Sequence, residues 1–93
     1  MTTLIPPASK PRLPRGVRLR RDEVRNVWLL LAPETIFELN GSSAEILKRC
    51  TGDKSLEDIV DDLAATFDVD RSRLESETRA LLDQLHGKRL LDL

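Results

Sequence analysis

The spacing of apolar residues changes once along the chain, close to residue 40. Before that point, short segments alternate or run continuously apolar, which predicts strands over residues 17–20, 27–32 and 35–39. The short links between them favour an antiparallel meander. Residues 27–32 are apolar throughout, so they are predicted to form a central strand covered on both faces. In the third strand, the period of two separates the side chains into one face with Thr35, Phe37 and Leu39 and another with Ile36 and Glu38.

After residue 40 the apolar residues recur at helical spacing in three segments. Ser42, Ser55 and Ser72 are each followed three residues later by an acidic residue, a capping-box pattern that begins a helix. Gly52 and Gly87 predict the C-caps of the first and third helices. The positions predicted to face the core are Ala44, Ile46, Leu47 and Cys50 in the first helix, Leu56, Ile59, Val60, Leu63, Ala64 and Phe67 in the second, Leu74, Thr78, Leu81, Leu82 and Leu85 in the third, and Leu90, Leu91 and Leu93 after it.

Three strands followed by three helices predict an α+β fold. The expected architecture is a three-stranded antiparallel meander followed by a three-helix bundle, similar to a winged helix-turn-helix domain. Prolines at four positions among residues 1–15 predict an extended, poorly ordered tail in front of a domain over residues 16–93. Exchange of this tail or of a strand between chains makes a homodimer an alternative to a monomer.

The N-terminal part of the chain is more basic than the rest. Residues 10–25 carry seven basic and two acidic side chains, whereas the whole chain has a net charge of −1. The basic arm is therefore either solvated and neutralised by the acidic body, or in contact with an acidic partner.

Groups suited to catalysis are sparse. His86 is the only histidine and Cys50 the only cysteine, so the sequence contains no nucleophile–base pair, internal disulfide or zinc ligand set. The acidic residues over 57–62 lack the glycine turn and alternating spacing of a calcium loop. We therefore expect a protein that is not an enzyme and needs no metal or cofactor. The single thiol and the absence of a long apolar segment predict a cytoplasmic protein that does not span a membrane.

A winged-helix-like fold leaves two classes of partner open. The third helix carries Arg71, Arg73 and Arg79 against three acidic residues, a balance that disfavours nucleic acid. The third strand ends the meander, so its outer edge can pair with an extended peptide. The same edge can instead be covered by the tail or by a second copy of the chain.

The segment Trp28-Leu29-Leu30-Leu31-Ala32-Pro33-Glu34 resembles the pyrroloquinoline quinone biosynthesis protein D family. The resemblance extends over about residues 16–93. It implies a peptide chaperone, similar to the recognition domains of other ribosomally made, modified peptides. Its partners would be the precursor peptide and the radical S-adenosylmethionine enzyme that cross-links a glutamate and a tyrosine of that peptide. The further positions that carry the resemblance are Leu39-Asn40, Ala44, Ile46-Leu47, Cys50, Gly52, Ile59, Leu63, Phe67, Gly87 and Leu90-Leu91.

The resemblance also implies a binding site, because the precursor in the wider group pairs with the third strand and lies against the third helix. Two alternatives stay open: a recognition domain of another modified-peptide pathway, and a winged-helix protein that binds nucleic acid. The implied peptide-binding residues are Thr35, Ile36, Phe37, Glu38 and Leu39 in the strand and Arg71, Leu74, Glu75, Thr78 and Leu82 in the helix.

Overall fold

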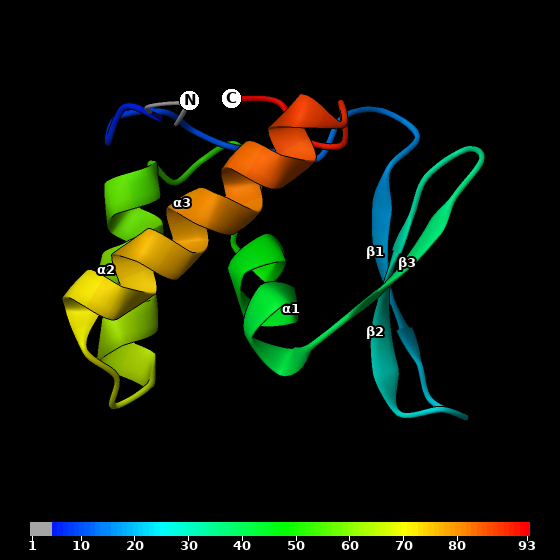
Figure 1. Ribbon diagram of the computed structural model, residues 1–93, viewed down its shortest axis with the longest axis horizontal. Helices are drawn as coiled ribbons and strands as arrows, with labels where there is room; N and C mark the ends of the chain where they lie inside the picture. Colours follow the sequence, from blue (N-terminus) through cyan, green and yellow to red (C-terminus); the bar gives the residue numbers. More distant parts are fainter. Residues whose placement is uncertain (1–4) are drawn as a thin grey trace.

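The computed structural model describes residues 5–93 and has the predicted α+β order. Its three strands form one antiparallel sheet in the order β1-β2-β3, and the helices lie together on one side of it (Figure 1). No helix among residues 5–93 has the length and apolar character needed to cross a membrane. The elements are β1 (Arg18–Asp22), β2 (Val27–Leu31), β3 (Ile36–Leu39), α1 (Gly41–Lys48), α2 (Leu56–Thr66) and α3 (Arg71–Gly87).

The central strand β2 is covered on one face only. Leu30 is fully buried beneath the helices, whereas Leu29 and Leu31 alternate to the other face and are half-buried. The prediction that both faces are covered was therefore wrong for the part of the chain described here. All three helices follow the sheet in sequence and pack on the same side of it. Half of the apolar side chains of β2 therefore lie on the face that the helices do not cover.

Two of the three predicted helix starts were wrong. Ser55 caps α2 as predicted, but Asn40 and Asp70 cap α1 and α3, each two residues before the predicted Ser42 and Ser72. Their side chains accept hydrogen bonds from the amides three residues further on, at 2.7 and 3.1 Å. Asparagine and aspartate cap helices as well as serine does, so the residue where the extended backbone ends takes the role.

Neither predicted glycine is a C-cap. The C-cap of α1 is Arg49, and Gly52 lies in the following turn with a φ of +85°. Gly87 is the last residue of α3, and the left-handed position after it is held by Arg89 with a φ of 61°. Glycine at position 52 is explained by its positive φ, which costs a residue without Cβ little.

The core contains most of the positions that the helical spacing predicted. Ala64 and Leu81 are half-buried at its edge. Phe67 and Leu93 were predicted to pack inward but are 38% and 41% exposed, because both follow the last ordered turn of their segment. The confirmed core positions are Ala44, Ile46, Leu47, Cys50, Leu56, Ile59, Val60, Leu63, Leu74, Thr78, Leu82, Leu85, Leu90 and Leu91.

Residues 5–15 lie against the helices, which differs from the poorly ordered tail expected there. Ile5 is 1% exposed within the core, and the main chain of Arg12 bridges both the turn after α1 and the C-terminal segment. The carbonyls of Pro7 and Ser9 accept the first two amides of α2, at 3.1 and 2.8 Å. Prolines lack an amide donor but keep the carbonyl acceptors that these hydrogen bonds use. The burial of Ile5 could not be predicted, because a single apolar residue forms no periodic pattern. Residues 1–4 of the predicted tail lie outside the described residues.

Arg49 fixes α1 to α2 through a cluster of ion pairs. Its Nε donates to Asp62 at 2.5 Å and its Nη1 to Glu45 at 3.0 Å. Hydrogen bonds from Lys48 and then Arg49 lower the pKa of Glu45, and a hydrogen bond from Arg49 lowers the pKa of Asp62. Because both carboxyl pKa values are lowered by folding, the cluster stabilises the fold above the ordinary carboxyl pKa and loses this contribution as the pH falls.

Replacing Arg49 should therefore make the stability of the domain less sensitive to acid. We expect Arg49→Gln to lower Tm near pH 7, and the difference from the unmodified protein to shrink as the pH falls from about 5 to about 3. Thermal unfolding followed by circular dichroism at several pH values measures this difference. A difference that stays constant over the whole range would show that the cluster contributes nothing through these carboxylates.

Candidate functional site

Among residues 5–93, β3 pairs with β2 alone, which leaves its other edge without a strand neighbour. Ala32 and Thr35 exchange both of their main-chain hydrogen bonds across the connecting turn, at 2.9 and 3.4 Å. In an antiparallel pair such hydrogen-bonded residues alternate with residues whose N–H and C=O point away from the partner strand. Counting from this pair, the main-chain groups of Ile36 and Glu38 point to the free edge.

The side chains of β3 divide as the sequence predicted. Phe37 and Leu39 are half-buried and pack against the core from the inner face of the sheet. Ile36, which is 66% exposed, and Glu38 lie on the outer face. Thr35 is exposed and directly precedes the strand. The strand thus offers donors and acceptors along its edge and apolar side chains toward the helices.

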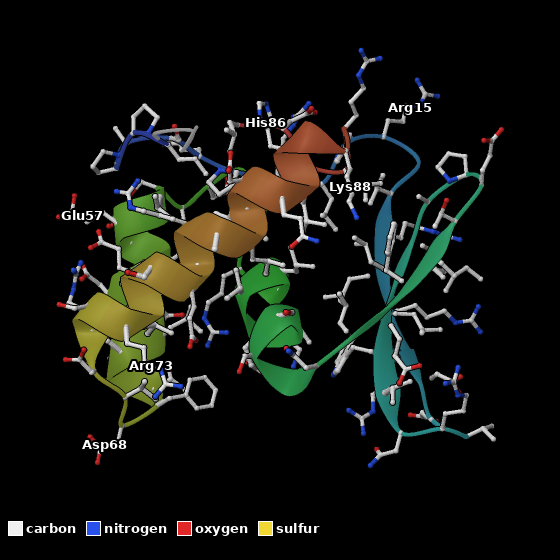
Figure 2. The ribbon with its side chains drawn as sticks, in the orientation of Figure 1. Arg15, Glu57, Asp68, Arg73, His86 and Lys88 are labelled. Atoms are coloured by element: carbon white, nitrogen blue, oxygen red, sulfur yellow. The ribbon has the colours of Figure 1, made fainter. Side chains whose placement is uncertain are left out.

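One flank of α3 faces this strand. The Lys88 ammonium lies 5.3 Å from the centre of the Phe37 ring, so the C-terminal end of α3 adjoins the inner face of β3. Figure 2 shows Lys88 between the end of α3 and the sheet. Steps of three and four residues back from Lys88 place Gln84, Leu81 and Glu77 on the same flank. α1 contacts both α3 and β3 and lies between them (Figure 1). We call the surface formed by this flank of α3, by α1 and by the inner face of β3 the β3–α3 groove.

A pocket lies at each end of this flank of α3, one beside Lys88 and one beside Glu77. A pocket of about 350 Å³ lies where β3 begins, with Thr35 and Lys88 in its wall. A larger pocket of about 590 Å³ opens where β3 passes into α1, between α1, the end of α2 and the start of α3. The larger pocket is lined by the apolar residues Ile46, Leu63, Phe67, Val69 and Leu74 and by Gly41, Ser42, Glu45, Arg73 and Glu77.

Three of the five predicted helix residues face the core rather than the strand. Leu74, Thr78 and Leu82 are 8%, 0% and 0% exposed. The Thr78 hydroxyl donates to the Leu74 carbonyl at 2.7 Å, which leaves it no free donor for a ligand. Leu74 is the one of the three that also lines the larger pocket. Thr78 and Leu82 therefore support α3 from within.

The other two predicted helix residues lie on the flank of α3 that faces α2 and the N-terminal arm. Arg71 forms an ion pair with Asp61 of α2 at 2.7 Å. Glu75 pairs with Arg79 at 3.6 Å, and the Arg79 guanidinium donates a hydrogen bond to the Ile5 carbonyl. The structure does not bring Arg71 or Glu75 to the β3–α3 groove.

The flank of α3 that does face the strand was not among the predicted site residues. Glu77, Leu81, Gln84 and Lys88 follow at steps of four, three and four residues, a spacing that is visible in the sequence. Leu81 had been predicted as a core position, and none of the four had been assigned to the peptide site. Helical spacing predicts which face of α3 is buried, but not which of the two neighbouring flanks faces the strand. That choice depends on how α3 crosses α1.

The side chains that commonly bind metal ions do not gather in the described part of the chain. No group of three or more histidine, cysteine, aspartate or glutamate side chains among residues 5–93 is placed to hold a metal ion. Cys50 is 4% exposed, and its thiol donates to the Ile46 carbonyl at 3.3 Å. Burial raises the pKa of this thiol to about 12, so the thiolate that nucleophilic chemistry requires is scarce at neutral pH.

Cys50 should accordingly be inert in the folded protein. We expect iodoacetamide at about pH 8 to leave the native thiol unmodified and to alkylate it once the chain is unfolded in guanidinium. Intact-mass spectrometry before and after unfolding distinguishes the two states. Rapid alkylation of the native protein would show that the thiol is accessible and ionised, contrary to its burial here.

The fold and the groove define a class of small α+β recognition domain, in which a free strand edge faces a helix and can add a further strand. The family model described as Coenzyme PQQ synthesis protein D matches residues 28–91, and this chain belongs to that family.

Individual relatives agree with the family model. The chain is 45% identical over 85 residues to the "PqqA binding protein" of Xanthomonas axonopodis pv. citri (strain 306), covering 91% of this chain and 92% of that one.

Two solved structures share the fold. The first is the solution structure of the PqqD part of Methylobacterium extorquens PqqCD, described as a stand-alone recognition element for ribosomally synthesised and modified peptides. It has a TM-score of 0.78 and 43% identity, covering 89% of this chain and 88% of that one. The second is TbiB1 in complex with the TbiA(beta) leader peptide, with a TM-score of 0.74, 28% identity, and coverage of 87% and 94%.

Proposed function

We propose that this chain is a non-catalytic peptide chaperone of pyrroloquinoline quinone biosynthesis. It binds the ribosomally made precursor peptide by strand addition at β3 and presents it to the radical S-adenosylmethionine enzyme that cross-links its glutamate and tyrosine. It works in the cytoplasm, where that peptide is translated, and uses no cofactor of its own. The observation that carries the proposal is the free edge of β3 facing the flank of α3. A relative named for PqqA binding and a similar domain solved with a leader peptide support it.

The binding energy comes from the edge and from the groove together. Ile36 and Glu38 offer two N–H and two C=O groups, and four ladder bonds at about 1 kcal/mol each supply about 4 kcal/mol. Micromolar affinity needs roughly 8 kcal/mol. Side chains of the peptide must therefore contribute the other half by burial in the β3–α3 groove, where Phe37, Leu39 and Leu81 present apolar surface.

The residues that we assign to peptide binding are accordingly revised on the helix side. The strand positions Thr35 to Leu39 stay as predicted, and Leu74 stays through the larger pocket. Arg71, Glu75, Thr78 and Leu82 act as positioning residues that hold α3 in place. Residues 16–93 form the recognition unit, and residues 5–15 brace its helices. The groove side of α3 is formed by Glu77, Leu81, Gln84 and Lys88.

The charge distribution on α3 argues against the nucleic-acid alternative. Its three arginines each form an ion pair, with Asp61, Glu77 and Glu75 respectively. Proteins gain affinity for nucleic acid when basic side chains neutralise phosphates and release their counterions. Arginines that are already paired with carboxylates contribute little of this affinity. The recognition helix of this domain therefore lacks the basic surface that a winged-helix reader of DNA presents.

A pair of arginine substitutions on α3 tests the groove. Gln84 is exposed on the flank facing β3, and Ser76 is exposed on the solvent side of the same helix. We expect Gln84→Arg to weaken binding of a synthetic precursor peptide by about tenfold or more, or about 1.4 kcal/mol, because the long side chain obstructs the groove. Ser76→Arg introduces the same side chain and should leave the affinity within about twofold.

Calorimetric titration of the two variants and the unmodified protein gives the affinities. Trp28, the only tryptophan in the chain, lies opposite Leu39 in the sheet. Arg21 and Lys48 lie 5.8 and 4.5 Å from the centre of its ring, and its fluorescence provides an independent signal. Equal peptide affinities for Gln84→Arg and Ser76→Arg would contradict the proposed groove.

A further inference from the structure

The outer face of the sheet, on the side away from the helices, carries a partly exposed apolar stripe. Val27, Leu29 and Leu31 follow one another along β2 on this face, and the register places Ile36 beside Leu31. The helices lie on the opposite side of the sheet (Figure 1). Ile36 is 66% exposed, and the three residues of β2 are only half-buried. We call these four residues the outer-face stripe.

A basic flank borders the outer-face stripe along β1. Arg18 lies beside Leu31 and Arg20 beside Leu29 in the register. Both arginines are exposed, and neither forms an ion pair with another of residues 5–93. On the β3 side, Glu38 is paired with Arg25 at 2.6 Å. The third outer-face residue of β1, Asp22, lies beside Val27, and its carboxylate accepts the amides of Val24 and Arg25 at 3.1 and 3.2 Å. The part of the face beside Leu29 and Leu31 therefore carries positive charge that can meet a partner.

Strand addition connects this face with the bound peptide. A peptide paired with the edge of β3 becomes a fourth strand of the same sheet, and its side chains alternate between the two faces. Half of them enter the β3–α3 groove, and the other half emerge on the outer face beside Ile36 and Glu38. A protein docked on the outer face would touch the carrier and the peptide at once.

We propose that the outer-face stripe and its basic flank are the docking surface for the enzyme that modifies the bound peptide. This inference rests on the proposed function. The complementary surface of that enzyme has an apolar centre and acidic residues placed to meet Arg18 and Arg20. Docking there aligns the peptide's outward side chains with the enzyme and leaves the groove closed over the inward ones.

The size of the face favours such a transient partner over a second copy of the chain. Three strands about 4.8 Å apart and five residues long at about 3.3 Å each give a face of roughly 240 Å². A stable complex usually buries about 800 Å² on each partner. The face is too small for a permanent dimer, and it suits an enzyme that must release the carrier after each turnover.

The test compares a charge reversal on this face with one elsewhere. Arg18→Glu/Arg20→Glu changes two exposed side chains, and Lys54→Glu reverses an exposed charge in the loop before α2. The purified radical enzyme of the pathway is titrated with each protein in the presence of saturating precursor peptide. We expect the double variant to weaken enzyme binding by more than about tenfold, and Lys54→Glu by less than about twofold.

The affinity for the free peptide, measured without enzyme, should be unchanged in the double variant. This second measurement separates the two proposals, because loss of peptide binding would concern the groove and not the docking face. Unchanged enzyme binding by the double variant would overturn the inference. So would a dimer in sedimentation that Leu29→Thr dissociates, since a second copy would then occupy the stripe. If the double variant is unfolded, Leu29→Thr takes its place in the enzyme titration with the same expected loss.

Discussion

Glu38→Pro is expected to reduce the affinity for the precursor peptide by at least about tenfold while leaving the domain folded. The Glu38 amide points away from β2, so proline at this position breaks no hydrogen bond within the sheet. It removes one donor from the free edge and places its ring where the added strand must lie. Lost ladder bonding and steric exclusion together exceed about 1.4 kcal/mol, which is tenfold in affinity.

Two matched variants isolate the amide as the cause. Glu38→Ala keeps the amide and removes only an exposed carboxylate, so its peptide affinity should stay within about twofold of the unmodified protein. Phe37→Pro removes an amide that bonds to β2 and should unfold the sheet. If Glu38→Pro binds the peptide as tightly as Glu38→Ala does, the peptide does not pair with the edge of β3.

Ile5→Ala is expected to cost about 2–5 kcal/mol of unfolding free energy, because it empties a fully buried site in the core. For a domain of this size each kcal/mol shifts Tm by about 4–8 °C, so a fall of roughly 8–40 °C should follow. The large effect comes from a residue in the segment that the sequence pattern assigns to a tail. Thermal unfolding followed by circular dichroism measures it.

Ile36→Ala is the control, since it makes the same substitution at an isoleucine that is 66% exposed. Its cost should stay below about 1 kcal/mol, the range of strand propensity. Equal losses of stability in the two variants would show that Ile5 is not buried in the core in solution.

The sequence predicted the fold because each period was local and unambiguous. The alternation around Phe37 and the helical spacing from Leu56 to Leu63 need no tertiary information, and the structure confirms both. Helix starts failed where a better-placed cap such as Asp70 preceded the predicted serine. The prediction of a poorly ordered arm was wrong, because Ile5 contacts residues far away in the chain and a local pattern carries no information about such contacts.

The sequence likewise predicted one side of the candidate site and not the other. The pairing strand followed from its place at the end of the meander, which depends only on the order of short links. The helix side did not, because a stripe such as Leu74, Thr78 and Leu82 marks the core and leaves two flanks that sequence alone cannot rank. The contact between Lys88 and Phe37 decides between those flanks. The apolar run of β2 predicted that both faces of the strand are covered, but residues 5–93 cover only one of them. This difference points to the outer face as an interface.

Amide hydrogen exchange of β3, with and without the precursor peptide, tests strand addition most directly. In the free protein the amides of Phe37 and Leu39 bond to β2, whereas those of Ile36 and Glu38 face the open edge. If the peptide adds as a strand to this edge, its binding slows exchange at Ile36 and Glu38 by at least about tenfold and changes exchange at Phe37 and Leu39 much less. Saturation with peptide while Ile36 and Glu38 continue to exchange at their free rates would contradict strand addition.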